Sequence, residues 1–356
     1  MALVFVGSVR AFAGKNMVCL GLARRMLDDG FNLAFTKPYG GKPLQVEGQI
    51  TDADAWNLNQ QLDLKQDPGQ CCLVVRTQDL LAQALRGETG DLMAEIKAHC
   101  QEMAQGRDLL FMAGEGTLRS GAMMGIGGYQ MVLETGAKAV LVDRYQNEFF
   151  LDDVLSARYR LGSNLAGVII NDVDPEMNDA LSGQVIPFLE RAGVPTLGVL
   201  PRDELLASVS VGEIGQALGA KILTGHGYLS RLVKRIFIGA MQVAHAQSIF
   251  GGAHDFACIV GGDRPDMQLA AIEGGAACLV LSGDLYPGEI ILSRAEEHQV
   301  PVLVARGDTY RVAHAVEQVR MRSSLGEPEK VARAQELVGS GVDFSLLYEK
   351  LGLKPK

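Results

Sequence analysis

A glycine–lysine pair near the N-terminus is the strongest indication of chemistry in this chain. Gly14 and Lys15 follow a short β-branched and aromatic run at residues 3–6 and precede an amphipathic helical pattern at residues 17–27. In a strand–turn–helix order, unpaired backbone N–H groups of the first helical turn face any anion bound at the turn, and the lysine adds a positive charge. The segment therefore predicts a phosphate-binding loop.

Two positions of this loop depart from the Walker A pattern. Val9 stands where the pattern has its first glycine, and Asn16 replaces the serine or threonine whose hydroxyl would hold Mg²⁺. An asparagine still offers a neutral oxygen, but it is a weaker ligand for Mg²⁺ than the usual arrangement. The alternative to a phosphate loop is an ordinary turn between a strand and a helix, since Gly-Lys pairs also occur by chance.

The elements around the loop alternate between strands and helices. Strand-like runs lie at residues 3–6, 33–36, 72–75, 109–113, 139–142, 166–170 and 196–200, and helical patterns lie between most of them, as at 78–85, 91–105 and 151–161. This alternation predicts a doubly wound parallel sheet in an α/β domain.

A second, smaller α/β series follows a polar connection at residues 201–225. Its strands are predicted at 235–238, 257–260, 278–281 and 302–304, and its helices near 265–274, 289–298 and 310–321. A polar helical tail is predicted at 327–352. We therefore expect domains at 1–206 and 207–326, followed by a C-terminal tail at 327–356.

Several polar residues come directly after predicted strands of the first series. Ser8 to Asn16 follow the first strand, Lys37 the second, Glu115 the fourth and Asn171 the sixth. Parallel sheets collect their ligands outside the carboxyl ends of the strands. Unrelated turn residues would lie at both ends of the strands. Because these polar residues all follow the carboxyl ends, their position favours the phosphate-loop interpretation.

Composition narrows the class of protein. With 356 residues, of which 47% are hydrophobic, the chain is long enough for two domains with their own cores. A net charge of −9 without a cluster of Lys and Arg argues against nucleic acid or an anionic membrane as a partner. The chain has no apolar run of about 18 residues, and its first residues form a strand pattern rather than a signal peptide, so we expect a cytoplasmic protein. The 6 cysteines lack C-x-x-C pairs and the 6 histidines form no cluster, so we expect buried reduced thiols and no zinc site.

At its polar segments the chain resembles a known family. The segments that carry this resemblance are VGSVRAFAGKN at 6–16, FTKP at 35–38, TDADA at 51–55, AGEG at 113–116, GVIIND at 167–172 and LGVLPRDELL at 197–206. They resemble dethiobiotin synthetase, which has a fold of the P-loop NTPase type. They are still more similar to the dethiobiotin-synthetase-like N-terminal domain of long bacterial phosphate acetyltransferases.

The second half resembles the DRTGG domain that comes next in those proteins. The similar segments are GAM at 239–241, GGDRPDMQLAAIEGG at 261–275, LVLSGDLYPG at 279–288 and VPVLVARGDT at 300–309. The acetyltransferase domain that completes the family's chains is not expected here, and neither is acetyltransferase activity.

The resemblance implies that the loop binds the phosphates of ATP or ADP. Gly14, Lys15 and Asn16 would line the phosphates, with Ser8 and Arg10 in the loop ahead of them. On the alternative interpretation these residues form a plain connection.

The resemblance also implies roles for polar residues outside the loop. Lys37 is similar to a lysine that helps to bind phosphate or carboxylate groups, Asp54 and Glu115 to carboxylates that serve Mg²⁺, and Asn171 to an asparagine that hydrogen-bonds to the adenine edge. The alternatives are a solvated lysine, two surface acids and an asparagine that forms a turn.

In the second module, polar residues after the strands are expected to border a crevice. The candidates are Asp263, Arg264, Asp266, Gly283 and Thr309. Alternatively, Asp266 simply caps a helix, and Asp263 with Arg264 forms a structural ion pair.

These observations favour a regulatory protein that binds an adenine nucleotide, with Mg²⁺ as the candidate metal ion bound beside it. The alternative is an ATP-dependent, carboxylate-activating synthetase similar to dethiobiotin or cobyrinic acid a,c-diamide synthase, although the segment PYGGKP after Lys37 lacks the serine usual there. A third hypothesis is a scaffold whose nucleotide site has decayed. The apolar segments at 236–241 and 269–281 exceed what a four-stranded unit easily hides, so we expect the second module to form a homo-oligomer or to bind a metabolic partner enzyme.

Overall fold

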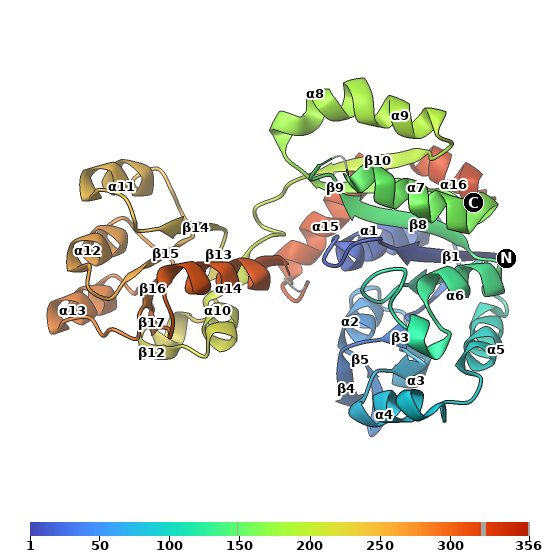
Figure 1. The fold of residues 1–356 in the computed structure, drawn as a ribbon, viewed down its shortest axis with the longest axis horizontal. Coiled ribbons are helices and arrows are strands. Elements are labelled where there is room, and N and C mark those ends of the chain that lie inside the picture. The colour runs from blue at the N-terminus through green and yellow to red at the C-terminus, as the bar shows by residue number, and fades with distance from the viewer. Residues whose placement is uncertain (148, 322–324, 355–356) are drawn as a thin grey trace. The chain divides into compact units, whose positions relative to one another are not determined.

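Strand β1 (Ala2–Gly7) lies inside a six-stranded sheet in which neighbouring strands are parallel. The computed structural model describes residues 1–147, 149–321 and 325–354. The strand order is β10-β9-β8-β1-β7-β2, with β2 at Leu33–Thr36, β7 at Leu109–Ala113, β8 at Lys138–Arg144, β9 at Leu165–Val173 and β10 at Thr196–Pro201 (Figure 1). The predicted parallel α/β sheet is confirmed.

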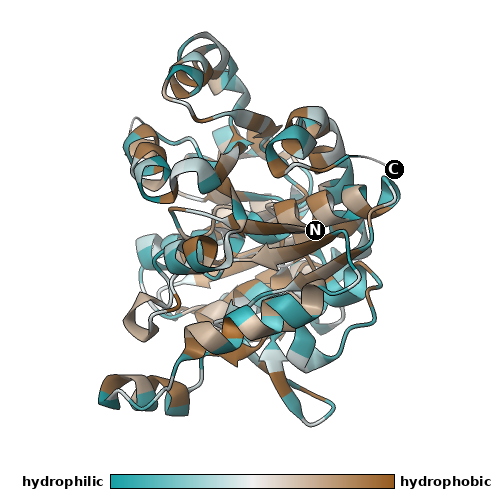
Figure 2. Cartoon of the chain, turned by 90° about the vertical axis from the view of Figure 1, so that its right-hand side faces the viewer, coloured by the Kyte–Doolittle hydropathy of each residue, from teal (hydrophilic) through white to brown (hydrophobic). Residues whose placement is uncertain are grey.

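Helices cover both faces of this sheet. On one face, α5 (Leu92–Ala104), α6 (Gly128–Thr135) and α7 (Phe149–Leu161) share a buried core with Phe5 of β1. Val4 and Val6 alternate with Phe5 and therefore point to the other face, where α1 (Lys15–Asp28) packs. The central strands, covered on both sides, are mostly hydrophobic along their length (Figure 2).

The chain forms two compact units. Unit 1 comprises Met1–Arg202 and Leu325–Lys356, and unit 2 comprises Asp203–Ser324. Unit 1 also holds α2 (Ala53–Gln61), α3 (Pro68–Cys71), α4 (Gln78–Arg86), α8 (Asn178–Ala180), α9 (Ile186–Arg191), and the hairpin of β4 (Pro43–Val46) and β5 (Gln49–Asp52). The strand predicted at 72–75 is wrong as a member of the main sheet, because α3 takes up the preceding residues. Only Val74–Val75 is extended, as β6, and it pairs with β3 (Tyr39–Gly40).

The helical tail is an integral layer of unit 1. It forms α15 (Pro328–Gly341), which packs on α1, and α16 (Phe344–Leu351), which contacts β9 and β10. The approach of α15 is so close that a Cβ atom on Gly21 of α1 would collide with Val338. The Tyr348 hydroxyl of α16 donates a hydrogen bond to Asp29 at 2.6 Å.

Unit 2 is built on a five-stranded sheet. The order is β12 (Lys221–Thr224), β17 (Val302–Val304), β16 (Cys278–Ser282), β15 (Phe256–Gly261) and β14 (Arg235–Ile238), with β12 antiparallel to the rest. One core lies between the sheet and α11 (Val243–Phe250), α12 (Pro265–Glu273) and α13 (Glu289–Glu297), and another lies on the side of α10 (Val211–Leu218) and α14 (Thr309–Met321).

Two expectations for unit 2 are wrong. The supposed polar connection at 201–225 contains α10 and β12, and also β11 (Val209–Ser210), which pairs with β13 (Leu232–Val233). A capping box between Ser210 and Glu213 starts α10. The apolar segment 269–281 is also not left uncovered, because the fifth strand and both helix layers bury Ala271, Cys278 and Leu281 completely.

Burial of the cysteines agrees with the sequence. All six are buried and none forms a disulfide. None of the helices within the described residues combines the length and the apolar character needed to cross a bilayer.

Candidate functional site

The loop Ser8–Gly14 joins β1 to α1 and leaves the start of α1 free for an anion. Gly14 is the N-cap of α1 with φ +86°, a conformation that favours glycine, and a Cβ atom there would also collide with the Asn171 amide. Gly14 has no side chain to cap the helix, and the first turn of α1 holds no acidic residue. The first N–H groups of α1 are thus available to a negatively charged group.

The Lys15 ammonium lies at this helix start and contacts only neutral oxygens. Its Nζ donates to Ser8 Oγ at 3.0 Å and to the Gly116 carbonyl at 2.5 Å. Within the described part of the chain, Lys15 forms no ion pair with a carboxylate. Burial lowers the pKa of Lys15 and outweighs the Glu115 and Asp143 carboxylates, which raise it from nearby without pairing with the ammonium.

Side chains from three neighbouring strand ends hold the loop. Ser8, fully buried, donates to the Arg10 carbonyl at 2.6 Å. Asp143, at the end of β8, accepts the Val9 N–H at 3.3 Å. Asn171, near the end of β9, donates from Nδ2 to the Ala13 carbonyl at 2.9 Å. These hydrogen bonds therefore support the conformation of the loop.

Lys37, at the exit of β2, lies within a set of three carboxylates. Its Nζ is 2.9 Å from Asp52, 2.6 Å from Glu115 and 3.6 Å from Asp54, and only 3% of the side chain is exposed. Burial lowers the pKa of Lys37, but the three carboxylates outweigh it and hold the pKa above its ordinary value. Lys37 is therefore a fixed cation, whereas Lys15 has no such partners.

The glycine pair after Lys37 makes room for these carboxylates. A Cβ atom on Gly40 would collide with Asp52, and one on Gly41 would lie 2.5 Å from Glu115 Oε1. Asp52 itself caps α2, accepting the N–H groups of residues 54 and 55. The PYGG segment is thus part of the cluster.

Asp54 connects this cluster to the loop. It pairs with Lys42 at 2.9 Å and accepts a hydrogen bond from Asn16. Burial raises the pKa of Asp54, but Lys37 and Lys42 outweigh it and lower the pKa below its ordinary value. Among the described residues, no three acidic, histidine or cysteine side chains are arranged to hold a metal ion alone. The oxygen donors of Asp54, Glu115 and Asn16 fit Mg²⁺ only together with phosphate oxygens.

The structure brings most of the predicted residues of the first half together. Those that gather at the loop are Ser8, Gly14, Lys15, Asn16, Lys37, Asp54, Glu115 and Asn171. Arg10 lies apart, because its guanidinium pairs with Asp153 of α7 at 3.0 Å. Sequence reasoning missed Asp52 and Asp143. The signals were an acid before a helix, in TDADA, and an acid that ends the apolar strand VLVD.

In unit 2 the predicted residues form smaller contacts. Arg264 and Asp266 make a two-point ion pair at 3.0 and 3.1 Å on the surface. Thr309 Oγ1 lies 2.7 Å from the buried Ser282 hydroxyl, and the Gly283 N–H donates to the Gly307 carbonyl at 2.7 Å. The alternative of a structural ion pair at Arg264 matches this geometry, with Asp266 rather than Asp263 as its partner.

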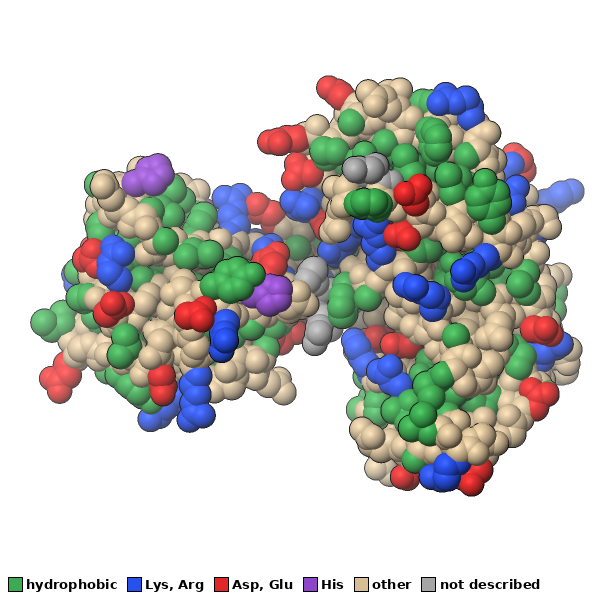
Figure 3. All heavy atoms as spheres, viewed as in Figure 1, with side chains coloured by type: hydrophobic (Ala, Val, Ile, Leu, Met, Phe, Trp, Pro, Cys, Tyr) green, Lys and Arg blue, Asp and Glu red, His purple; other side chains and the backbone are tan. Residues whose placement is uncertain are grey.

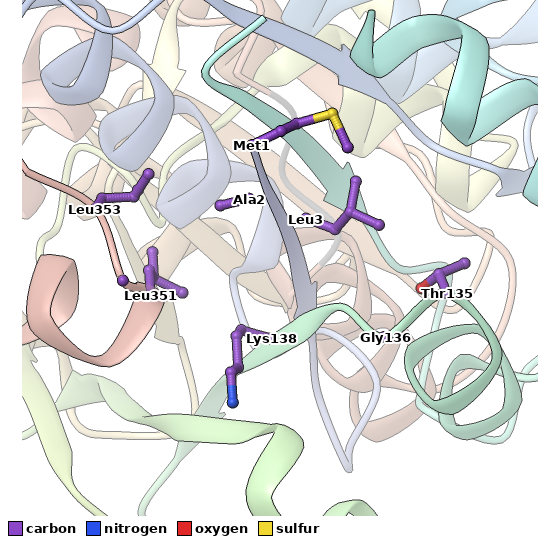
Figure 4. Close-up of a pocket in the computed structure, with 9 residues that line it drawn as sticks. Met1, Ala2, Leu3, Thr135, Gly136, Lys138, Leu351 and Leu353 are labelled. Atoms are coloured by element: carbon purple, nitrogen blue, oxygen red, sulfur yellow. The ribbon is translucent and has the colours of Figure 1, made fainter.

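A hollow of about 400 Å³ lies near the amino-terminal ends of β1 and β8, away from the loop, which follows the carboxyl end of β1. Its lining includes Met1, Leu3, Thr135, Lys138 and Leu351, near the starts of β1 and β8 (Figure 4). Lys138 donates to the Ser163 carbonyl at 2.8 Å. None of the predicted site residues lines this hollow.

Two family models match neighbouring parts of the chain. Residues 3–210 match the model of a family described as an AAA domain, and residues 213–319 match the DRTGG domain. The phosphate acetyltransferase of Pseudomonas aeruginosa is 23% identical, over 98% of this chain and 52% of its own. That of Deinococcus radiodurans is 24% identical, over 99% of this chain and 51% of its own. The MinD cell division protein of Aquifex aeolicus superposes with a TM-score of 0.35 at 14% identity, covering 58% of this chain and 84% of that one.

The matches confirm the resemblance seen in the sequence. A P-loop domain like that of dethiobiotin synthetase precedes a DRTGG domain, and the similarity to phosphate acetyltransferases extends over nearly the whole chain. The chain spans about half the length of these relatives.

Proposed function

Because the chain belongs to the AAA domain family, with a DRTGG domain after it, we propose that it is a regulatory protein that binds ATP or ADP through the loop Ser8–Asn16. The observation that carries this proposal is the environment of Lys15. A cation held among neutral oxygens, beside a helix start without a cap or an acid, is set up for an anion.

Electrostatics explain why a polyphosphate suits this position. A charge removed from water without a partner is destabilising, and an anion beside the Lys15 ammonium relieves that cost. The unpaired N–H groups of α1 supply further donors at the same point. Lys37 cannot serve in this way while it is engaged with Asp52, Asp54 and Glu115.

Selection of adenine rests on Asn171 in this proposal. Its Nδ2 is engaged with the Ala13 carbonyl, but among the residues that the structure describes its Oδ1 makes no hydrogen bond. An amide oxygen accepts a hydrogen bond from the exocyclic amine of adenine. Guanine has a carbonyl oxygen at the same position of the ring and cannot donate this bond. Asn171 would therefore hold the loop with one end and contact the base with the other.

Mg²⁺ would bind together with the nucleotide. Asp54 and Glu115 would serve the ion, with Asn16 as a neutral oxygen ligand, and the ion would neutralise phosphate charge. Since both carboxylates already pair with lysines, we expect weak Mg²⁺ binding without nucleotide.

Calorimetric titration with ATP tests the proposal. Hydrogen bonds to charged groups contribute about 1.5–3 kcal/mol, so Lys15→Met should weaken ATP binding by about tenfold or more. Lys138→Met is the matched control, because Lys138 lies at the other edge of the sheet. Equal affinities of wild type and Lys15→Met would refute the phosphate loop, and absence of ATP and ADP binding by the wild type would refute the function.

A regulatory role is supported by the departures from a catalytic loop. Val9 and Asn16 replace the Walker A glycine and hydroxyl, and Lys37 is paired with carboxylates. The six buried thiols support a reducing compartment, the cytoplasm.

Unit 2 would provide assembly, with a second copy or with a metabolic enzyme. Large apolar side chains remain exposed on it, including Ile238, Leu285, Tyr286, Ile290 and Tyr310 at 43–80%. Figure 3 shows hydrophobic side chains on the visible face of this unit.

The second candidate function is an ATP-dependent, carboxylate-activating synthetase. The observation that favours it is the convergence of Lys37, Asp54 and Glu115 on the loop. ATP cleavage that depends on a small carboxylic acid would distinguish it from the regulatory function.

A further inference from the structure

Asp143 is a buried acid beneath the loop to which neither function above assigns a role. Its side chain is fully buried at the end of β8, the strand beside β1. Oδ2 accepts the N–H of Val9, the residue in the place of the Walker A glycine, at 3.3 Å. Oδ1 accepts the N–H of Arg144 at 2.8 Å. The carboxyl group thus connects Val9, near the start of the loop, to β8.

Among the residues that the structure describes, no lysine or arginine forms a salt bridge with Asp143. Arg10 from the loop is engaged with Asp153 of α7, and Arg144 on the same strand pairs with Asp172 at 3.4 Å. Lys15 of α1 is near enough to interact electrostatically but hydrogen-bonds elsewhere. Asp143 therefore carries a buried negative charge that is favoured by the Arg144 and Val9 N–H groups and by the nearby Arg10 guanidinium, and disfavoured by Asp153.

We propose that Asp143 is a positioning residue of the phosphate loop and that it takes up a proton when a nucleotide polyphosphate binds. The proposal rests on the proposed function, because it needs a polyphosphate at Lys15. The protonated acid still has lone pairs for the Val9 N–H, so the loop keeps its conformation while the repulsion between carboxylate and phosphate is removed.

The titration range of Asp143 makes this coupling observable. Burial raises its pKa to about 6, against the Arg144 hydrogen bond and Arg10, which lower it. A nearby polyphosphate raises the pKa further, since a like charge disfavours the ionised form. Affinity is then highest below the pKa of the free protein and falls as the pH rises toward the pKa of the complex. Each unit of pKa raised by the ligand corresponds to about tenfold in affinity across that window.

Calorimetric titration with ATP in two buffers of different ionisation enthalpy, from pH 5.5 to 8, tests the proposal. The difference in heat between the buffers counts protons taken up by the full chain. ATP itself titrates in this range, so Asp143→Asn, which keeps size and an acceptor oxygen, gives the contribution of the nucleotide alone. Asp79→Asn is the matched control, because Asp79 is an exposed acid of α4 in the same unit and does not act on Asp143.

The expected result is a proton uptake by wild type and by Asp79→Asn that exceeds the uptake by Asp143→Asn. Relative to Asp143→Asn, the affinity of wild type should fall by about tenfold between pH 5.5 and 8. ATP binding with equal proton uptake in wild type and Asp143→Asn would overturn the role of Asp143. Absence of ATP binding at every pH would instead refute the proposed function. If Asp143→Asn does not fold, wild-type uptake no larger than that calculated from the proton affinity of ATP also overturns the inference.

Discussion

Removal of a single buried contact in the tail should destabilise the whole of unit 1. Leu347 of α16 is fully buried and its helix contacts β9 and β10, which belong to the sheet that carries the loop. We therefore expect Leu347→Ala to lower the free energy of unfolding of unit 1, although the residue lies outside the N-terminal segment that forms the sheet.

The magnitude follows from burial. Leu→Ala substitutions at fully buried positions cost about 2–5 kcal/mol. A domain of this size loses about 2–4 °C in Tm for each kcal/mol, so a loss of about 3 kcal/mol lowers the Tm by about 6–12 °C. Leu85→Ala provides the control, since Leu85 lies in α4 of the same unit with 79% of its side chain exposed, and it should change stability by at most about 0.5 kcal/mol.

Thermal unfolding followed by calorimetry separates the units if they unfold in two transitions. Leu20→Ala, at a fully buried position of α1, marks the transition of unit 1. Leu347→Ala should lower the Tm of that same transition. If Leu347→Ala leaves the Tm of this transition at the wild-type value while Leu20→Ala lowers it, the tail is not a layer of unit 1.

Three further predictions concern the site and assembly. Asn171→Ala should weaken ATP binding and remove the preference for ATP over GTP, because it deletes both the support of Ala13 and the contact to the base; equal affinities of wild type for the two nucleotides would contradict the role in base selection. Wild type should hydrolyse ATP slowly or undetectably in a phosphate-release assay, and Asn16→Thr should raise the rate by improving the Mg²⁺ site; rapid hydrolysis by wild type that depends on a carboxylic acid would favour the synthetase. Light scattering of the full chain should give the mass of a dimer or a larger species. The double variant Leu285→Glu with Tyr310→Glu should reduce this mass, whereas Tyr159→Glu, at an exposed position of α7 in unit 1, should not. A monomeric wild type would refute assembly.

The sequence predicted the parts of the fold that follow from local patterns. The strands of the main sheet are continuous apolar runs, which buried parallel strands require, and the alternation with helices determined the class. The strand expected at 72–75 was wrong as part of the main sheet, because a short apolar run does not show which strand it will pair with. The helix α3 ends at Cys71, and only Val74–Val75 is extended, paired with β3 outside the main sheet. The missed helix α10 begins at a capping box in SVGE, a signal present in the sequence but overlooked among polar neighbours.

The sequence predicted which residues lie at the site, but not which of their side chains contact one another. The rule for the edge of a parallel sheet brought Lys37, Glu115 and Asn171 to the loop. It does not tell that Lys37 is surrounded by carboxylates or that the Asn171 amide faces the Ala13 carbonyl, because those pairings depend on side-chain directions across several elements. Arg10 was assigned to the phosphates from its place in the loop, and its ion pair with Asp153 could not be foreseen because the two residues are distant in sequence.

The placement of α15 and α16 in unit 1 has a consequence for the order in which the chain folds during synthesis. The ribosome completes all of unit 2 before it makes the two helices that cover α1 and its neighbouring strands. Until then, the side of α1 that carries Gly21 is open, and exposed apolar surface of this kind favours aggregation. Unit 2, a continuous segment, has all its strands and helices beforehand. Helix α1 therefore receives its last packing layer only after the second unit has been made. In a growing chain, unit 2 is the first of the two units that can be complete.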